Sequence, residues 1–579
     1  MKKHDRGALW HKIKSNPDLT VVVIGAGVNG ISVYRELALQ GVSVLLVDKG
    51  DFCSAASSAP SRMIHGGLRY LETGETSLVK ESLKERNLLL RNAPHFVRPL
   101  PTTIPIFYWT AGVLPAIRRF IGADTKPSRR GAAIIKVGLW LYDFFTRHEQ
   151  VLPRHGFHSR AATHQRWPEL NPGLVCSATY FDAWVSDPER LALEMILDTQ
   201  EQAPDATALN YVAVQSGCHD SLLLQDRISG EETKVWPSIV VNATGAWIDF
   251  TNASLERKTS FIGGTKGSHL VVDSEELLQA TAGHMIFYEN PDGRVCVLFP
   301  FKGKVLVGST DLPVDRPDDV KCTPEERAYI LESLAYIFPE IDIRPEQILY
   351  TFSGVRPLPR SDAQVTGEIS RNHQCRETPA DGDHAFHIYS MIGGKWTTFR
   401  AFGEQVADRV LSRLGQSRRM STVHLAIGGG AGYPTNDDGL SQMYIEISQS
   451  TRLSVERVTT LVERYGTRAR LMADFLVAGS DEALRFLPDY SQREMRFLIE
   501  QERVVRLADL VMRRTPLAIS GHLNAARLAE VNQLLGEILG WSQQRCEQEL
   551  TRTIDDLVAC HDLSREQLVR TDEPHTQIA

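Results

Sequence analysis

The pattern of hydrophobic and polar positions near the start of the chain predicts a strand, a helix and a second strand. Residues 21–24 form an unbroken run of Val and Ile, which is typical of a strand buried on both faces. The apolar positions then take a helical spacing through Leu39, and a second apolar run covers residues 42–47. The chain therefore opens with a strand–helix–strand unit of the α/β class.

The turn between the first strand and the helix has the pattern Gly-x-Gly-x-x-Gly. Gly25 permits a tight turn, Gly27 lets a pyrophosphate approach the backbone, and Gly30 lets the helix pack closely on the strand. Unpaired amides at the helix N-terminus attract an anion. Asp48, at the end of the second strand, is placed to accept hydrogen bonds from a ribose diol. The pattern predicts dinucleotide binding, and an acid at position 48 argues against a 2′-phosphate.

The segment after the second strand indicates which dinucleotide is bound. A simple nicotinamide enzyme would continue with another crossover helix, whereas this chain continues with "GDFCSAASSAPSRMIHGGLRYLE" at residues 50–72. Its many small residues let the backbone lie against a long ligand. We therefore predict FAD, with its flavin extending beyond the first strand–helix–strand unit.

Composition and charge restrict the classes of protein that remain. A chain of 579 residues is long enough for two or three domains. Its net charge of -7 gives no overall attraction to nucleic acid. The eight cysteines show no CxxC pair and no metal-ligand spacing, and the charged N-terminus does not resemble a signal peptide. We expect reduced thiols in the cytoplasm, no metal site and no nucleic-acid partner.

Further motifs follow in order along the chain. They are "FDAWVSDPERLAL" near residue 181, "VVNATGAWID" near 240, "GTKGSHLVVD" near 264, "LFPFKGKVLVGSTDLP" near 298, "FSGVRPL" near 352 and "GGKWTTFR" near 393. Together with residues 51–72 they resemble the FAD-dependent glycerol-3-phosphate dehydrogenases, within the D-amino-acid-oxidase-like flavoprotein superfamily. The resemblance extends over about residues 20–555, because "RYGTRA" and "ADLVMRRT" are similar to that family's helical C-terminal domain.

The resemblance implies an α/β fold: a Rossmann-type FAD-binding domain with an inserted mixed-sheet substrate and cap domain, followed by an all-helical C-terminal domain. We expect an N-terminal extension at residues 1–19, an oxidoreductase domain with interleaved parts at 20–424, and the helical domain at 436–579. Residues 425–435 are the predicted linker, because three successive glycines hold regular structure poorly. A strand ending at Gly245 is expected within the oxidoreductase domain.

The glycine pattern and the resemblance together predict the residues that contact FAD. The small residues after position 50 lie along the cofactor, the strand ending at Gly245 passes its adenosine side, and a helix starting after the "GGKWT" turn directs its amides and dipole at the flavin. The predicted cofactor-binding residues are Gly25, Gly27, Asn29, Gly30, Asp48, Lys49, Ser57, Ser58, Ser61, His65, Gly67, Ala243, Gly245, Gly394, Lys395, Trp396 and Thr397.

A dehydrogenase acting on a polyol phosphate must hold a dianion, take a proton from a hydroxyl and aim the carbon's hydride at flavin N5. Guanidinium forks suit the phosphate, and histidine suits proton abstraction because its ordinary pKa is near neutrality. The resemblance places His269, Arg69 and Arg356 beside the substrate as catalytic residues and leaves open which one is the base. The further predicted substrate-binding residues are Tyr70, Arg371 and Lys395.

The resulting hypothesis is oxidation of glycerol 3-phosphate to dihydroxyacetone phosphate, with electrons passed to a quinone. Differences from the best-known members leave the substrate open. These are the proline-rich segment at residues 99–147, and Trp396 and Phe399 where Leu and Tyr are commoner. The alternatives are a dehydrogenase of another polyol phosphate, such as erythritol phosphate, an amine or amino-acid oxidase on the same scaffold, and a flavin-binding protein without catalysis.

A quinone is dissolved in lipid, yet the longest uncharged run, residues 99–117, is interrupted by four prolines and does not suit a spanning helix. We therefore expect peripheral membrane contact through Pro99–Phe145, at the inner face of the cytoplasmic membrane, where aromatic residues adjoin basic ones. Packing of these residues over the substrate cavity is the alternative, and a homodimer is left open. The basic residues are Arg118, Arg119, Lys126, Arg129, Arg130 and Lys136.

Overall fold

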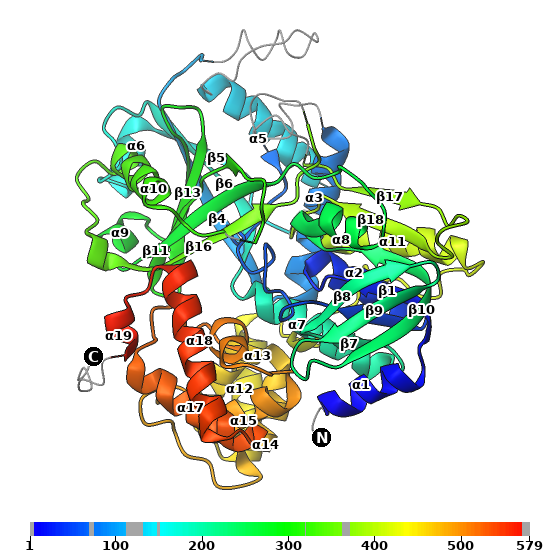
Figure 1. Ribbon diagram of the computed structural model, residues 1–579. Coiled ribbons are helices and arrows are strands. Elements are labelled where there is room, and N and C mark those ends of the chain that lie inside the picture. The colour runs from blue at the N-terminus through cyan, green and yellow to red at the C-terminus, as the bar shows by residue number, and fades with distance from the viewer. Residues whose placement is uncertain are drawn as a thin grey trace.

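The computed structural model describes residues 5–68, 75–111, 131–147, 151–318, 320–361 and 371–569. Two β-sheets lie side by side, and a helical C-terminal part packs beneath them (Figure 1). The chain passes between the two sheets repeatedly, so that each is assembled from segments far apart in the sequence. The predicted fold is confirmed: a Rossmann-type sheet, an inserted mixed sheet and a helical C-terminal part.

The first sheet contains the predicted strand–helix–strand unit. Strands β18, β10, β1, β2 and β7 run parallel, and β17 adds an antiparallel edge. The antiparallel pair β8 and β9 extends from the first half of β10. The bounds are β1 Asp18–Ile24, β2 Val44–Val47, β7 Thr207–Leu209, β8 Val212–Cys218, β9 Ser221–Asp226, β10 Glu232–Asn242, β17 Gln374–Thr378 and β18 His387–Ile392.

Alternate residues of β1 face opposite sides of this sheet, and both sides are covered. Val21 and Val23 pack against helices on one face, whereas Val22 and Ile24 pack against β8, β9 and the N-terminal helix on the other. This explains why the strand is apolar throughout. The helices on the first face are α2 Val28–Leu39, α7 Pro188–Gln202 and α11 Phe399–Arg413, and the N-terminal helix is α1 Arg6–Ser15.

The second sheet is mixed and has the strand order β15-β11-β14-β13-β12-β4-β6-β3, with β16 also paired to β11 and β5 to β6. It forms the substrate part. Its bounds are β3 Met63–Ile64, β4 Val97–Ile106, β5 Gly156–Ser159, β6 Cys176–Val185, β11 Thr265–Val272, β12 Met285–Glu289, β13 Val295–Phe301, β14 Lys304–Gly308, β15 Leu312–Pro313 and β16 Ile348–Arg356.

Different helices pack on the two faces of the second sheet. Leu270 and Val272 of β11 pack against α9 and α10, while Val271 contributes to a core shared with the C-terminal helices. Helices α3 and α5 cover the end of the sheet formed by β4 and β6. The helices of this part are α3 Thr76–Asn92, α5 Ala132–Thr146, α6 Arg160–Arg166, α9 Glu275–Ala280 and α10 Pro324–Ile337, while α8 Ile248–Ser254 packs on β8, β10 and β18 of the first sheet.

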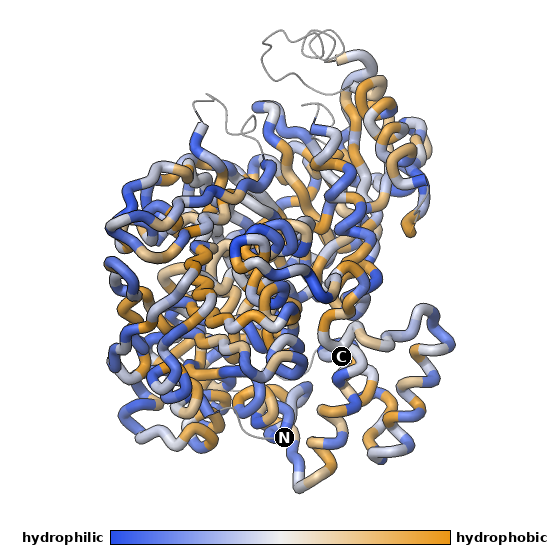
Figure 2. Tube along the Cα trace, turned by 90° about the vertical axis from the view of Figure 1, so that its right-hand side faces the viewer, coloured by the Kyte–Doolittle hydropathy of each residue, from blue (hydrophilic) through white to orange (hydrophobic). Residues whose placement is uncertain are grey.

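The C-terminal part is helical and shares its core with the second sheet (Figure 1). Figure 2 shows polar and apolar positions interleaved along the helices, and in the described ranges no helix is long and apolar enough to cross a bilayer. The bounds are α12 Asp437–Thr451, α13 Val455–Tyr465, α14 Ala469–Val477, α15 Gln492–Gln501, α16 Leu507–Asp509, α17 Ala525–Leu539, α18 Gln543–His561 and α19 Arg565–Val569.

Two local expectations are wrong. The strand predicted to end at Gly245 ends at Asn242, and residues 245–247 form a 3-10 turn. The three glycines of the predicted linker form another 3-10 turn, Gly428–Gly430, which is buried. Its backbone approaches α7, where the amides of Gly428 and Gly429 donate to Asp198 and Glu194. Because glycine has no side chain, the turn can approach α7 this closely. The three glycines therefore allow the turn to pack against α7.

Candidate functional site

A cavity of about 1010 Å³ lies between the two sheets and reaches the C-terminal helices. The β1–α2 turn, residues 48–63 and the end of β10 line one part of it, and β11, β16 and residues 393–397 line another. The first part and residues 393–397, which follow β18, belong to the Rossmann-type part, whereas β11 and β16 belong to the inserted sheet. An elongated ligand can therefore extend from the glycine-rich turn to the substrate part.

The glycine-rich turn is as closely packed as the sequence predicts. A Cβ on Gly25 would lie 2.7 Å from the carbonyl oxygen of Ala243, and one on Gly30 would lie 1.9 Å from that of Gly25. Gly27 is the N-cap of α2 and supplies no side-chain cap, while the next amide, of Val28, donates to Ser57 Oγ over 3.0 Å. The helix N-terminus consequently faces the cavity through its backbone, as pyrophosphate binding requires.

Asp48 lies at the end of β2 on the edge of the cavity. Its Oδ2 accepts from the Ala26 amide over 2.7 Å and its Oδ1 from the Gly50 amide over 2.8 Å. Burial raises the pKa of this carboxyl despite these hydrogen bonds. Asp48 thus braces the glycine-rich turn as well as facing the position predicted for a ribose. Lys49 next to it is exposed and pairs with Asp318 at 3.1 Å.

Residues 57 and 393–397 meet across the cavity from distant parts of the chain. The indole nitrogen of Trp396 donates to the Ser57 carbonyl over 2.9 Å, and Asn29 Nδ2 donates to the Gly393 carbonyl over 3.2 Å. A Cβ on Gly394 would lie 2.4 Å from Asn29 Nδ2. Asn29 Oδ1 is buried without a hydrogen-bond partner in the described ranges. The close approach of Gly394 to Asn29 and the unpartnered Asn29 Oδ1 both fit a site that holds a bound dinucleotide.

Most of the predicted cofactor residues share this cavity. Gly30 lies below the lining, against the Gly25 carbonyl, and Gly67 also lies outside the lining, in the backbone of the loop after β3. Thr398 is the N-cap of α11 and makes no side-chain capping bond. The predicted residues that line the cavity are Gly25, Gly27, Asn29, Asp48, Lys49, Ser57, Ser58, Ser61, His65, Ala243, Gly245, Gly394, Lys395, Trp396 and Thr397.

His269 on β11 faces the cavity although only 1% of it is exposed. Its Nε2 lies 2.8 Å from Ser61 Oγ, and its ring stacks on Phe352 with a centroid separation of 4.9 Å. Nδ1 is buried without a hydrogen-bond partner among the described residues. Burial, helped by Arg356 and Arg62, lowers the pKa of His269 to about 3. The imidazole is therefore neutral near pH 7 in the substrate-free protein.

Arg356 and Arg371 converge on the same carboxylate, that of Asp311. Arg356 Nη1 lies 3.0 Å from Asp311 Oδ1 and Arg371 Nη2 lies 3.4 Å from Asp311 Oδ2. Arg356 also donates to the Thr310 carbonyl and to Ser309 Oγ, each over 3.2 Å. Both arginines line the cavity. The structure therefore brings together two of the predicted phosphate ligands, from β16 and from the segment before β17.

Asp311 was missed by sequence reasoning, although it stands in the quoted "GSTDLP" motif directly after β14. An acid in a turn near the predicted site was the available signal. Arg69 and Tyr70 lie outside the described residues, so their predicted roles stay predictions.

Lys395 is a half-buried amine at the same end of the cavity. Its Nζ donates to Ser82 Oγ of α3 over 2.8 Å. Burial lowers the pKa of this amine to about 7, although Glu81 and Asp182 favour its charged form. Lys395 can thus change its charge near neutral pH in response to a bound anion.

The loop carrying His65 rests on a buried polar cluster that the sequence did not reveal. Asp182 on β6 accepts from the Gly66 amide over 3.0 Å, from Arg86 Nη1 over 3.0 Å and from the Tyr142 hydroxyl over 2.5 Å. A Cβ on Gly66 would lie 2.3 Å from that hydroxyl oxygen. The second glycine of the "IHGG" run, Gly67, has φ 79, a value that favours glycine.

The residues that line the cavity show the features of a dinucleotide-binding site. In the described part of the chain, no group of three or more His, Cys, Asp or Glu side chains could hold a metal ion. The residues that line the cavity fit FAD, an organic redox cofactor.

Comparisons with known proteins agree with this geometry. Residues 20–409 match the family model described as FAD dependent oxidoreductase, and residues 420–546 match the C-terminal domain of alpha-glycerophosphate oxidase. A glycerol-3-phosphate dehydrogenase of Synechocystis sp. is 34% identical over 566 residues, which cover 93% of this chain and 96% of the relative. The aerobic glycerol-3-phosphate dehydrogenase of Bacillus subtilis is 28% identical, covering 85% and 86% respectively.

A solved structure gives the same fold. The glycerol-3-phosphate dehydrogenase of Bacillus halodurans, in complex with FAD, superimposes with a TM-score of 0.73 at 22% identity, over 99% of each chain. The oxidoreductase model alone spans more than half of this chain. FAD is the cofactor, as predicted from the glycine-rich turn and the small residues after it. The chain belongs to the family of FAD-dependent glycerol-3-phosphate dehydrogenases.

Proposed function

We propose that this protein oxidises glycerol 3-phosphate to dihydroxyacetone phosphate. The observation that carries the proposal is one cavity that joins the dinucleotide turn to a cluster of Arg356, Arg371, Lys395 and His269. Its relatives named glycerol-3-phosphate dehydrogenase support the choice of substrate. When bound, FAD supplies the acceptor for the hydride that leaves C2.

Residues of the chain bind the phosphate and accept the proton. Arg356 and Arg371 bind the phosphate, since paired guanidinium groups suit a phosphate dianion. Lys395 adds charge to the same pocket once the anion raises its pKa. His269 is neutral in the free site and hydrogen-bonded to Ser61, and it takes the proton of the C2 hydroxyl once the bound dianion raises its pKa. Loss of one hydride and one proton converts the alcohol into the ketone.

Another polyol phosphate would use the same cations, so substrate choice within this class is tested directly. An amine or amino-acid oxidase would need one carboxylate-binding arginine, and the cluster of Arg356, Arg371 and Lys395 in this cavity favours a phosphate instead.

The first experiment is an anaerobic titration of the holoenzyme with glycerol 3-phosphate, erythritol phosphate, other polyol phosphates and amino acids, followed by flavin bleaching. We expect glycerol 3-phosphate to bleach the flavin at the lowest concentration. In Arg356→Ala the apparent affinity for substrate should fall by about 2 to 4 kcal/mol, the usual loss for a charge-assisted contact, while the flavin stays bound. Bleaching by an amino acid alone would refute the phosphate assignment, and unchanged affinity in Arg356→Ala would remove that residue from the phosphate site.

We also propose that the electrons pass to a quinone, and that helix α5 contacts the membrane in which the quinone is dissolved. α5 packs one face on β4 and β6 through Ile135 and Leu139. On its other face Val137 and Trp140 are each 60% exposed and Phe144 is 42% exposed. These three residues recur at helical spacing and form an apolar stripe towards solvent.

Neighbouring residues add the other features of an interfacial segment. Trp109 is 61% exposed, and the guanidinium of Arg147 lies 4.2 Å from the centroid of the Phe144 ring. Aromatic side chains beside cations suit the headgroup region of anionic lipid. The predicted basic residues 118, 119, 126, 129 and 130 lie outside the described residues. The eight cysteines are unpaired, which supports the cytoplasmic side of the membrane.

Co-sedimentation with anionic phospholipid vesicles tests the membrane contact. The protein should sediment with vesicles, and a variant carrying Trp140→Ser and Phe144→Ser should not. Trp236→Ser is the matched control, because Trp236 is an exposed tryptophan on the other sheet. Equal sedimentation of all three proteins would place the contact elsewhere. If the stripe instead covers a second copy of the chain, the double variant would change the mass in solution without changing vesicle binding.

A further inference from the structure

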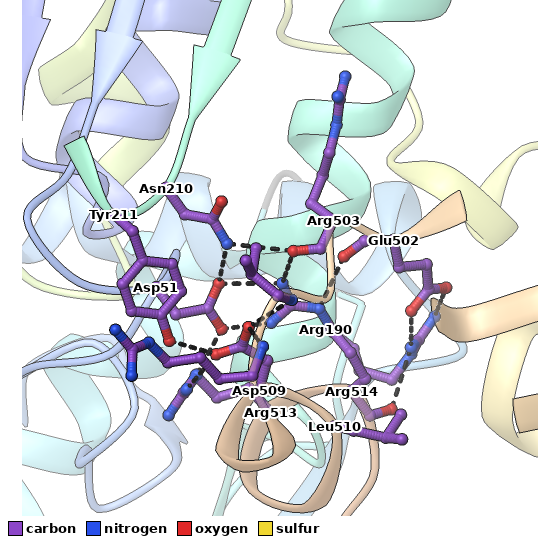
Figure 3. Close-up of polar contacts among 12 residues, drawn as sticks. Asp51, Arg190, Asn210, Tyr211, Glu502, Arg503, Asp509, Leu510, Arg513 and Arg514 are labelled. Carbon is purple, nitrogen blue, oxygen red and sulfur yellow. Dashed lines mark hydrogen bonds and ion pairs between the residues drawn. The ribbon is translucent and has the colours of Figure 1, made fainter. Parts of the chain in front are cut away.

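The C-terminal helical part docks on the FAD-binding part through a buried ion cluster centred on Asp51 (Figure 3). Arg514 places Nη1 2.5 Å from Asp51 Oδ2 and Nη2 3.0 Å from Asp51 Oδ1, and Arg513 Nε lies 2.5 Å from Oδ2. Arg513 Nη2 also donates to Asp509 Oδ1 over 2.8 Å. Tyr211 from the FAD-binding part donates its hydroxyl to the same Asp509 oxygen over 2.5 Å.

Asp51 stands in the middle of a short segment that is fastened at both ends to the glycine-rich turn. At one end Asp48 accepts from the Ala26 amide, and at the other the Cys53 amide donates to the Ala26 carbonyl over 2.9 Å. Residues 48–51 and 54–63 line the cofactor cavity. The position of Asp51 therefore fixes the backbone that faces the cofactor.

Both cations in contact with Asp51 come from the C-terminal part, whereas its own part contributes the Asn210 amide, which donates over 2.7 Å. Burial alone would raise the pKa of Asp51, but Arg514 and Arg513 hold it well below its usual value. The Asp51 side chain has 0% exposure. A buried carboxylate that loses its cations is strongly unfavourable. Undocking of the C-terminal helices would thus force residues 48–53 to move.

We propose that the C-terminal helical part retains the cofactor: by docking on Asp51 it holds residues 48–53 against the glycine-rich turn and slows the release of FAD. The helices then have a defined role at a distance from the reacting atoms, and Asp51 is a positioning residue. Because linkage is reciprocal, bound FAD also strengthens the docking of the C-terminal helices.

The same interface provides a matched control. Arg190 of α7 forms a bidentate pair with Glu502 of the C-terminal part, with both contacts at 2.8 Å and both side chains buried. Glu502 does not line the cavity and stands outside residues 48–53, although its partner Arg190 lines the cavity and donates to the Arg514 carbonyl over 3.1 Å. Asp51→Asn and Glu502→Gln each remove one buried interdomain charge with little change of shape. They differ in whether the charge lies on the cofactor-lining segment.

The test is the rate of FAD release from full-length holoenzyme on dilution, followed by the rise in flavin fluorescence. We expect release at least about 10-fold faster in Asp51→Asn and within about 2-fold of the native rate in Glu502→Gln, a tenfold change corresponding to about 1.4 kcal/mol. Native release by Asp51→Asn would overturn the proposal. Release from Glu502→Gln that is as fast as release from Asp51→Asn would also overturn the proposal. It would show that the loss of any buried charge at this interface speeds FAD release, wherever the charge lies.

Arg513→Gln is the second variant, in case Asp51→Asn does not fold. It removes the contacts of Arg513 with Asp51 and Asp509 and leaves the Arg514 pair in place. We expect faster FAD release than in the native protein and, by hydrogen exchange of the holoenzyme, weaker protection of residues 48–53. Native values for both would overturn the proposal. Hydrogen exchange is measured without turnover, so it is independent of the substrate proposed above.

Discussion

At the scale of single residues, the site depends on groups whose charge is set by burial. His269 is neutral because it is buried beside Arg356. The hydrogen bond between its Nε2 and Ser61 Oγ orients the imidazole ring. Asp311 holds Arg356 and Arg371 close together. The residue types could be predicted from their motifs. Their protonation could not, because it depends on neighbours that lie far away in the sequence.

Lys395 leads to a prediction about pH. Burial lowers its pKa to about 7 in the substrate-free protein, and a bound phosphate dianion will raise it. Below pH 7 the amine is charged both before and after binding, so its attraction is fully present. Above pH 7 the free protein loses this proton and must regain it on binding. kcat/KM should therefore fall as pH rises above about 7, by up to about tenfold per unit.

The control for this prediction is Lys395→Arg, whose guanidinium stays charged. Its kcat/KM should remain level across the same alkaline range when measured with the same substrate. A fall that is identical in both proteins would assign the titration to another group.

At the scale of elements, the contact between β1 and α2 determines how closely the cofactor can approach. Gly30→Ala would place a methyl group 1.9 Å from the Gly25 carbonyl oxygen, so helix and turn would have to separate. We expect a loss of about 1–3 kcal/mol of stability, typical of overpacking, together with a lower flavin content per protein. Flavin absorbance relative to protein absorbance, and thermal unfolding of the purified variant, measure the two effects.

Gly382→Ala is the control, since a Cβ at Gly382 meets nothing within 4 Å and its φ is not positive. It should keep native flavin content and stability. A Gly30→Ala protein that also kept both would show that α2 can shift without disturbing the cofactor.

At the same scale, several elements were predictable because their signals are local. The helix expected to reach Leu39 ends there, and the expected strand at 21–24 is the buried end of β1. The turn at residues 428–430 was misjudged because its stability comes from α7, whose carboxylates accept its amide hydrogens. A glycine run in isolation indicates only backbone freedom.

At the scale of the whole molecule, the two sheets and the C-terminal helices together form the site. Gly354 of β16 lies so close to residues 56–59 that its Cβ would be 2.9 Å from Ala59 Cβ. β11 and β16, which carry His269 and Arg356, are neighbours in the second sheet. The catalytic and cofactor parts are thus held in contact by backbone packing between segments almost three hundred residues apart.

The sequence by itself determined the cofactor, because a glycine-rich turn, its following acid and a run of small residues act through local backbone geometry. It indicated the family through a resemblance carried by motifs that follow in order along the chain. It also indicated His269, Arg356, Arg371 and Lys395 through their motifs. Only the tertiary structure decided that Asp311 lies between two arginines, that Ser82 contacts Lys395, and that Asp51 receives its cations from the C-terminal helices. These contacts join positions that are widely separated along the chain. The charge states of these residues depend on burial, which cannot be predicted from a local sequence pattern.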